Sequence, residues 1–163
     1  MTHQIVLYGE IWPRFERNRL GISAARFEQQ LASIDPGCCV DLLIDSPGGD
    51  YNAALAIARR IRDNRARLTS YARYMCFSGA VLLATAASQF FVEPDASLFI
   101  HRAIADPPDR KLEAAISSEY AAELKLNRPG LDLRDIWRWQ QEEKTFTATE
   151  AVEVGLADAI RNW

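Results

Sequence analysis

Ile44-Asp45-Ser46-Pro47-Gly48-Gly49-Asp50 is the stretch that decides how this chain folds, because it joins a β-prone run to a helical one. Pro47 has no N–H group and biases Ser46 toward an extended backbone. Gly48 and Gly49 lack Cβ atoms, so a ligand can approach the main chain at a helix entrance, where N–H groups favour anions and developing oxyanions. The same residues also fit a plain strand-to-helix turn with two glycines.

The size and composition of the chain indicate one domain with an ordinary core. It has 163 residues, of which 48% are hydrophobic, and its net charge of −3 does not indicate nucleic-acid binding. The arginines between residues 59 and 67 are interrupted by Asp63 and are interpreted as a solvated helix face. No apolar run has the length of a membrane span, and no signal peptide precedes the first strand. The three cysteines form neither a disulfide framework nor a metal motif, so we expect a cytoplasmic protein without a metal or another cofactor.

Strand and helix patterns alternate along the chain, which predicts an α/β fold. Ser23 is a candidate N-cap, Thr147 and Glu150 form a candidate capping box, and Gly155 is a candidate helix stop. The helix expected at 78–87 is apolar on every side and should be buried. The expected strands are 4–8, 39–45, 68–75, 89–92 and 98–101, and the other expected helices are 24–33, 51–65, 111–126, 133–144 and a short one after Thr147.

Two histidines limit the search for a catalytic base. His3 lies near the N-terminus, which we expect to be frayed, whereas His101 ends an apolar strand. Ser78 begins the buried helix, where its hydroxyl would lie at the positive end of the helix dipole. Taken singly, Ser78 could be an N-cap and His101 a structural residue. Together with the glycine turn, they supply a nucleophile, a base and oxyanion donors at the ends of strand–helix units.

These motifs resemble the proteolytic subunit of the Clp protease (ClpP) and its phage-type relatives. The short start of the chain, residues 4–11, is similar to the phage and prophage branch. The resemblance implies a ClpP/crotonase-type spiral of repeated strand-strand-helix units. It also implies a single peptidase domain over residues 1–163, with 102–144 as its helical handle and oligomerisation region. The matching blocks, in family order, are 44–49, 78–84, Pro94 with 100–101, and 147–158.

The resemblance also assigns roles by position. Ser78 falls where the family has its nucleophile and His101 where it has its general base. Gly49 and Gly79 fall where the family has the main-chain donors of its oxyanion hole. Glu143 occupies the slot of the third triad member, which is an aspartate in the family, and a glutamate can also orient a histidine. The alternative for Glu143 is a solvated carboxylate at a helix end.

The chain departs from the family pattern in several places. Cys76 and Phe77 precede the serine where the family usually has small residues, and the link from Ser78 to His101 is shorter. The segment 102–111 lacks the glycine-rich stretch of the housekeeping subunits. The chain begins almost at its first core strand, so we expect the family's axial loop and leading helix to be missing, and docking to an ATPase chaperone stays an open question.

The preferred interpretation is a serine endopeptidase that cleaves peptides or unfolded proteins. The first alternative is a crotonase-type acyl-CoA enzyme with the same fold, and the second is a catalytically inactive scaffold. A Ser–Lys dyad is a further alternative, although none of the three lysines, Lys111, Lys125 and Lys144, lies in a recognisable dyad motif.

Apolar residues after the histidine suggest a homo-oligomer larger than a dimer, because one small domain would expose too much apolar surface. We expect helix 111–126 to form part of the interface. The residues that suggest it are Leu112, Ala115, Ile116, Tyr120 and Leu124, with Trp137 and Trp139 on the next helix.

Overall fold

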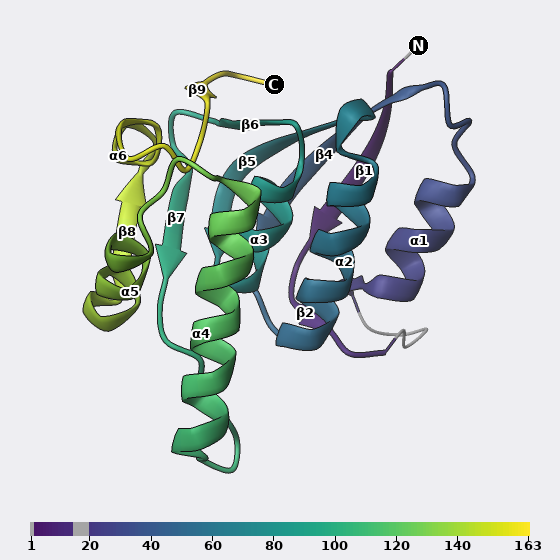
Figure 1. Cartoon of the computed structure of the whole chain (residues 1–163). Helices are drawn as coiled ribbons and strands as arrows, with labels where there is room; N and C mark the ends of the chain where they lie inside the picture. Colours follow the sequence, from purple (N-terminus) through teal and green to yellow (C-terminus); the bar gives the residue numbers. More distant parts are fainter. Residues whose placement is uncertain (1, 15–19) are drawn as a thin grey trace.

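The computed structural model describes residues 2–14 and 20–163. A seven-stranded sheet forms one layer of the molecule, and its strands run parallel except for one antiparallel pair (Figure 1). The main path of the sheet runs β1 (Thr2–Tyr8), β4 (Cys39–Ser46), β5 (Leu68–Phe77), β6 (Gln89–Val92) and β9 (Ala159–Ile160). β7 (Ser97–Ile100) follows β6 along the same edge of β5, and β8 (Lys144–Thr147) pairs antiparallel with β7.

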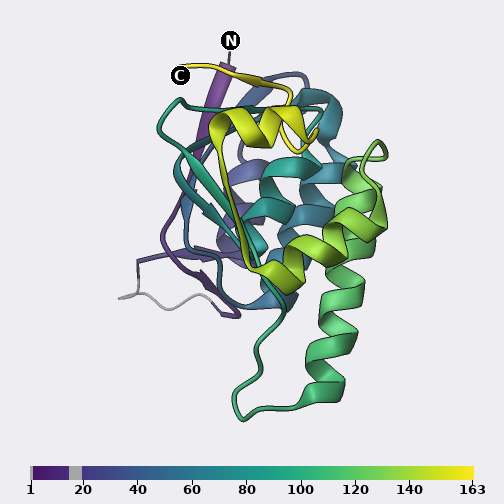
Figure 2. The same cartoon turned by 90° about the vertical axis from the view of Figure 1, so that its left-hand side faces the viewer.

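Helices pack on one side of this sheet, and one of them extends well beyond it. Figure 2 shows α4 (Arg110–Asn127), drawn in green, and the chain that leads into it reaching past the other layers. A second, two-stranded sheet joins β2 (Ile11–Trp12) to β3 (Ile22–Ser23), and a 3₁₀ turn, η1, spans Arg65–Arg67. The α-helices are α1 (Ala24–Ala32), α2 (Tyr51–Asp63), α3 (Gly79–Ala86), α4 (Arg110–Asn127), α5 (Leu133–Glu142) and α6 (Ala148–Glu153).

The predicted α/β spiral of strand-strand-helix units is confirmed. All eight residues of α3 are buried, as expected from a segment that is apolar on every side. Ser23 accepts a hydrogen bond from the Arg26 N–H, and Thr147 and Glu150 form the predicted capping box. Among the described residues, no helix has both the length and the apolar character needed to cross a membrane.

Four expectations from the sequence are wrong. The helix expected over 133–144 ends at Glu142, and Lys144 begins β8 instead. His3 is not frayed, because it lies in β1 and pairs with Val40 of β4. The arginines of α2 are not only a solvated face, since Arg59 and Arg62 both bind Glu123, a buried carboxylate on α4. The last error concerns three of the residues expected at an oligomer interface, because Tyr120, Leu124 and Trp139 pack into the subunit's own core. Helical periodicity identified their apolar face correctly but not what covers it.

Candidate active site

The glycine turn after β4 is held by its neighbours in a way that leaves one N–H group free. Ser46 Oγ accepts the Gly48 N–H at 3.1 Å, and the Ile11 N–H donates to the Gly48 carbonyl at 2.8 Å. The Asp50 N–H returns to the Ile11 carbonyl at 2.8 Å. A Cβ atom at Gly49 would collide with the main chain of Ile11, so only glycine fits. No hydrogen bond among the described residues uses the Gly49 N–H, which therefore stays available as a donor.

Ser78 is strained and does not act as a helix cap. Its φ of 54° and ψ of −120° are unusual for a non-glycine residue, and such a conformation costs about 1–3 kcal/mol. Its side chain makes no capping hydrogen bond to α3. The Ser78 N–H donates to the Phe99 carbonyl at 2.7 Å, which ties this residue to β7. The strained main chain, and a hydroxyl without a hydrogen-bond partner among the described residues, are features of a nucleophile at a sharp strand-to-helix turn.

The glycine turn and the serine turn pack directly against each other. A Cβ atom at Gly48 would lie 2.7 Å from the Phe77 carbonyl oxygen and 2.9 Å from the Ser78 Cβ. A Cβ atom at Gly79 would lie 2.8 Å from the Cβ of Ala54 on α2. Gly79 is the first residue of α3, so its N–H group has no acceptor within the helix. The missing Cβ atom at Gly48 lets the two turns approach closely, and the missing Cβ atom at Gly79 lets the start of α3 approach α2.

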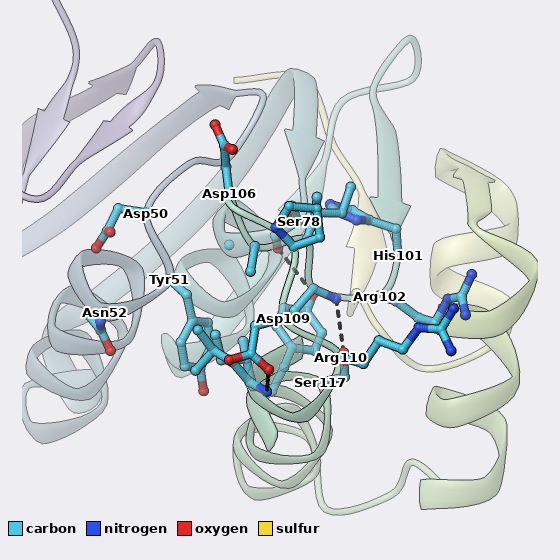
Figure 3. A pocket seen from close by; sticks show the side chains of 18 of the residues that line it. Asp50, Tyr51, Asn52, Ser78, His101, Arg102, Asp106, Asp109, Arg110 and Ser117 are labelled. Atoms are coloured by element: carbon cyan, nitrogen blue, oxygen red, sulfur yellow. Dashed lines mark hydrogen bonds between the residues drawn. The ribbon is translucent and has the colours of Figure 1, made fainter. Parts of the chain in front are cut away.

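A cavity of about 970 Å³ brings four of the five predicted site residues together. Gly49, Ser78, Gly79 and His101 all line it, and Figure 3 shows Ser78 and His101 on neighbouring segments at one end. Apolar side chains from the chain after β7 and from α4 form another part of its wall, including Ile104, Leu112, Ile116 and Tyr120.

His101 lies against an aromatic neighbour rather than against the serine. Its ring stacks on that of Phe99, with centroids 5.1 Å apart and planes inclined by 16°. Phe99 in turn meets Phe77 edge to face at 5.8 Å. No hydrogen bond joins His101 to Ser78 within the residues that the structure describes. The aromatic row therefore sets the position of the imidazole in the free subunit.

Glu143 is placed near His101 by strand register but does not contact it. Ile100 pairs with Lys144 at the end of the antiparallel β7–β8 ladder, so the next two residues, His101 and Glu143, would be opposite each other. Glu143 instead adopts a left-handed conformation at the end of α5, with φ of 51°. Its side chain is exposed and lines a neighbouring cavity beside Arg102 and Trp137. In the described part of the chain it makes no hydrogen bond to His101.

Cys76, the nearest thiol in sequence, is not suited to act as the nucleophile. It is fully buried between β4 and β7, where it pairs with Ser46 and Leu98. Burial, and to a smaller extent the charge of Asp45, raises the pKa of the Cys76 thiol, so it stays protonated at neutral pH. Among the described residues, no group of His, Cys, Asp and Glu side chains could hold a metal ion.

Two contacts at this site have no signal in the sequence. The Tyr120 hydroxyl donates to the Ser78 carbonyl at 3.1 Å across 42 positions of the chain, and Ile11 supports the glycine turn. Helical periodicity placed Tyr120 on an apolar face, but the contact with Ser78 depends on how α4 lies on α3. The isolated bridge of Ile11 to Gly49 depends on the path of a short irregular segment.

Comparison with known proteins agrees with this geometry. The family model for Clp protease matches residues 23–162. The ATP-dependent Clp protease proteolytic subunit of Ligilactobacillus salivarius is 28% identical over 73% of this chain, and the match spans only 65% of that protein's length. Subunit 2 of Treponema denticola is 27% identical over 98% of this chain and 82% of its own length.

Solved structures agree as well. Two structures of ClpP1 from Listeria monocytogenes, one of them a point mutant, give TM-scores of 0.81 and 0.83 at 17% and 18% identity. They cover 98% and 99% of this chain and 91% and 92% of theirs. At this identity they show the shared fold. Because the family model spans most of the chain, the chain belongs to the Clp protease family, whose members are serine-type peptidases.

Proposed function

We propose that this chain is a ClpP-like serine endopeptidase with Ser78 as its nucleophile. The observation that carries the proposal is the strained Ser78, whose hydroxyl caps no helix and which lines the same cavity as His101. A serine held in this way at the entrance of a buried helix is suited to acyl transfer. The alternative of a crotonase-type acyl-CoA enzyme is not favoured, because the family model and the curated relatives are Clp proteases.

The proposed reaction is hydrolysis of a peptide bond in two steps. Ser78 Oγ attacks the carbonyl carbon while His101 takes its proton, and the negative charge on the carbonyl oxygen is stabilised by the N–H groups of Gly49 and Gly79. The tetrahedral intermediate collapses with loss of the amine, which takes the proton from His101. Water then attacks the acyl-enzyme by the same route and releases Ser78. Catalysis requires the imidazole to come within hydrogen-bond reach of Ser78 from its place on Phe99.

Glu143 is proposed as the carboxylate that orients His101. Its support is the β7–β8 register, in which His101 and Glu143 follow the last paired residues. A carboxylate here would fix the imidazole tautomer and stabilise the imidazolium that forms during attack. Because the Glu143 side chain is exposed in the structure, it must change position to reach the His101 ring.

The substrate class and the assembly are part of the same proposal. The apolar part of the cavity wall suits extended peptides or unfolded protein, and we place the protein in the cytoplasm as a homo-oligomer larger than a dimer. Residues 102–144 are the proposed handle. Within it, Leu112 and Trp137 are exposed and available for an interface, whereas Tyr120, Leu124 and Trp139 are buried in the subunit. The names of the curated relatives describe subunits of an ATP-dependent protease, but an ATPase partner is not part of this proposal.

The test is hydrolysis of a fluorogenic peptide library by the wild type and by Ser78→Ala, with sedimentation of both. We expect cleavage by the wild type, none by Ser78→Ala, and the same oligomer larger than a dimer for both. Cleavage by the variant at the wild-type rate would contradict the role of Ser78. A monomer of 18.4 kDa at micromolar concentration would contradict the assembly.

A further inference from the structure

The Ser78 carbonyl is the point at which α4 contacts the proposed catalytic machinery. It accepts two hydrogen bonds, one from the Val81 N–H at 3.0 Å and one from the Tyr120 hydroxyl at 3.1 Å. A carbonyl oxygen has two lone pairs, so its acceptor capacity is fully used. The bond from Val81 lies within the first turn of α3, whereas the bond from Tyr120 comes from a different element.

This carbonyl belongs to the peptide unit that carries the Gly79 N–H. A peptide unit is planar and trans, so its C=O and N–H groups point in opposite directions and rotate together. A hydroxyl that fixes the Ser78 oxygen therefore also fixes the direction of the Gly79 N–H. Donation to the carbonyl also polarises the amide, which strengthens the N–H as a donor.

We propose that Tyr120 is a positioning residue for the oxyanion hole, acting through the Ser78 carbonyl on the Gly79 N–H. This inference rests on the proposed function and deepens it. Tyr120 touches neither the nucleophilic oxygen nor the scissile bond in this role. Its contribution is to hold the strained peptide unit at Ser78 in the orientation that the transition state requires.

The surroundings of Tyr120 are suited to such a role. The side chain is 6% exposed, and burial raises the pKa of its phenol, so the hydroxyl remains a neutral donor at working pH. About two turns further along α4, Asn127 Nδ2 donates to the Leu82 carbonyl and to Thr85 Oγ1, both at 3.2 Å. The hydrogen bonds from Tyr120 and Asn127 therefore fix where α4 lies along α3 and how α4 is rotated about its own axis.

The same face of α4 also holds the chain that follows His101. Ser117 Oγ accepts the Ala103 N–H at 2.9 Å, and Glu113 Oε1 accepts the Ala105 N–H at 3.0 Å. Residues 113, 117 and 120 follow each other at helical spacing, so they line one face. That face therefore supports both the nucleophile turn and the segment after the base.

The test compares Tyr120→Phe with Tyr74→Phe, which alters an exposed tyrosine of β5. The first change removes one oxygen atom and keeps the ring, so the core packing is retained. Kinetics are measured per titrated active site on a fluorogenic peptide, together with inhibition by a peptide boronate, which forms a tetrahedral adduct on serine. A merely structural role would reduce the number of titrated sites and leave their properties unchanged.

Direct loss of an oxyanion donor costs about 10²–10³ in kcat, so an indirect loss is expected to cost about tenfold. In Tyr120→Phe, kcat should fall by about tenfold, and the boronate affinity should fall in parallel. KM should stay within about twofold of the wild-type value. Tyr74→Phe should match the wild type. If Tyr120→Phe has the same kcat and the same boronate affinity as the wild type, the positioning role is overturned.

Should Tyr120→Phe fail to fold, 3-fluorotyrosine at position 120 provides the second measurement. Fluorine makes the phenol a stronger donor and keeps its shape, so kcat per site should rise, and an unchanged kcat would overturn the inference. A wild type that neither cleaves peptides nor binds the boronate would contradict the proposed function, and this inference with it. An active wild type beside an unaffected variant contradicts the positioning role alone.

Discussion

Arg62 Nη1 lies 2.8 Å from Glu123 Oε2, and this ion pair joins α2 to α4 at the edge of the core. Glu123 also accepts from Arg59 at 2.6 Å, so both of its oxygens are used. Burial alone would raise the pKa of the Glu123 carboxyl, but the hydrogen bonds from Arg59 and Arg62 outweigh it, and the pKa is lowered. The pair fixes the half of α4 that carries Tyr120.

We predict that Glu123→Gln destabilises the fold by about 2–3 kcal/mol, which is less than a fully buried pair would lose because Arg59 is half exposed. Denaturant unfolding at pH 7 measures this loss. Glu28→Gln is the matched control, since it removes the exposed pair with Arg60 and should cost less than about 1 kcal/mol. Equal losses in the two variants would contradict the buried role of Glu123.

Acidification should reduce the difference between Glu123→Gln and the wild type. A carboxyl whose pKa is lowered in the folded state contributes its stability above the unfolded pKa, and that contribution is lost as the pH falls through the folded pKa. The contribution of Glu123 should therefore be complete at pH 7 and decline below about pH 4.5, the ordinary value for a glutamate. A difference that grew between pH 7 and pH 3 would contradict the assigned direction of the shift.

Gly48→Ala should disturb the serine turn as well as the glycine turn. The new Cβ would lie 2.7 Å from the Phe77 carbonyl, and the φ of 90° is unfavourable for alanine. We expect fluorophosphonate labelling at least about tenfold slower, because the Ser78 geometry depends on this contact. Gly130→Ala is the control, since nothing lies within 4 Å of its added methyl group. Equal labelling rates in the two variants would contradict the dependence of Ser78 on Gly48.

The carboxylate assignment separates Glu143 from its neighbour Glu142. Glu142 is the last residue of α5, whereas Glu143 follows the helix in a left-handed conformation and is opposite His101 by the β7–β8 register, so the register singles out Glu143. If Glu143 orients the imidazole, Glu143→Gln lowers kcat by at least about tenfold, while Glu142→Gln stays near the wild type. Steady-state kinetics on one peptide substrate measure both. Similar kcat values for the two variants would remove Glu143 from the mechanism.

Much of the fold could be predicted because its signals are local. Strand 39–46, the glycine turn and the buried helix after Ser78 follow from β-propensity, missing Cβ atoms and continuous apolar composition. The association of Ser78 with His101 followed from the resemblance of the motifs, in their order and spacing, to the ClpP family, and the structure brings both residues to one cavity.

The remaining features depend on tertiary contacts that no local pattern encodes. The direction of α4 decides that Tyr120 and Leu124 face the core, and it decides that Glu123 receives Arg59 and Arg62. The edge-to-face contact of Phe77 with Phe99, on which the His101 ring stacks, depends on the parallel pairing of β5 with β7. Such contacts join residues far apart in sequence, where periodicity carries no information.

The central claim is that Ser78 is the nucleophile of a peptidase, and covalent labelling tests it most directly. The wild type is treated with a fluorophosphonate, digested, and analysed by mass spectrometry to locate the adduct. The account predicts one adduct, on Ser78, and no labelling of Ser78→Ala or of His101→Ala at a comparable rate. An adduct on another residue, or labelling of Ser78→Ala as fast as the wild type, would contradict it.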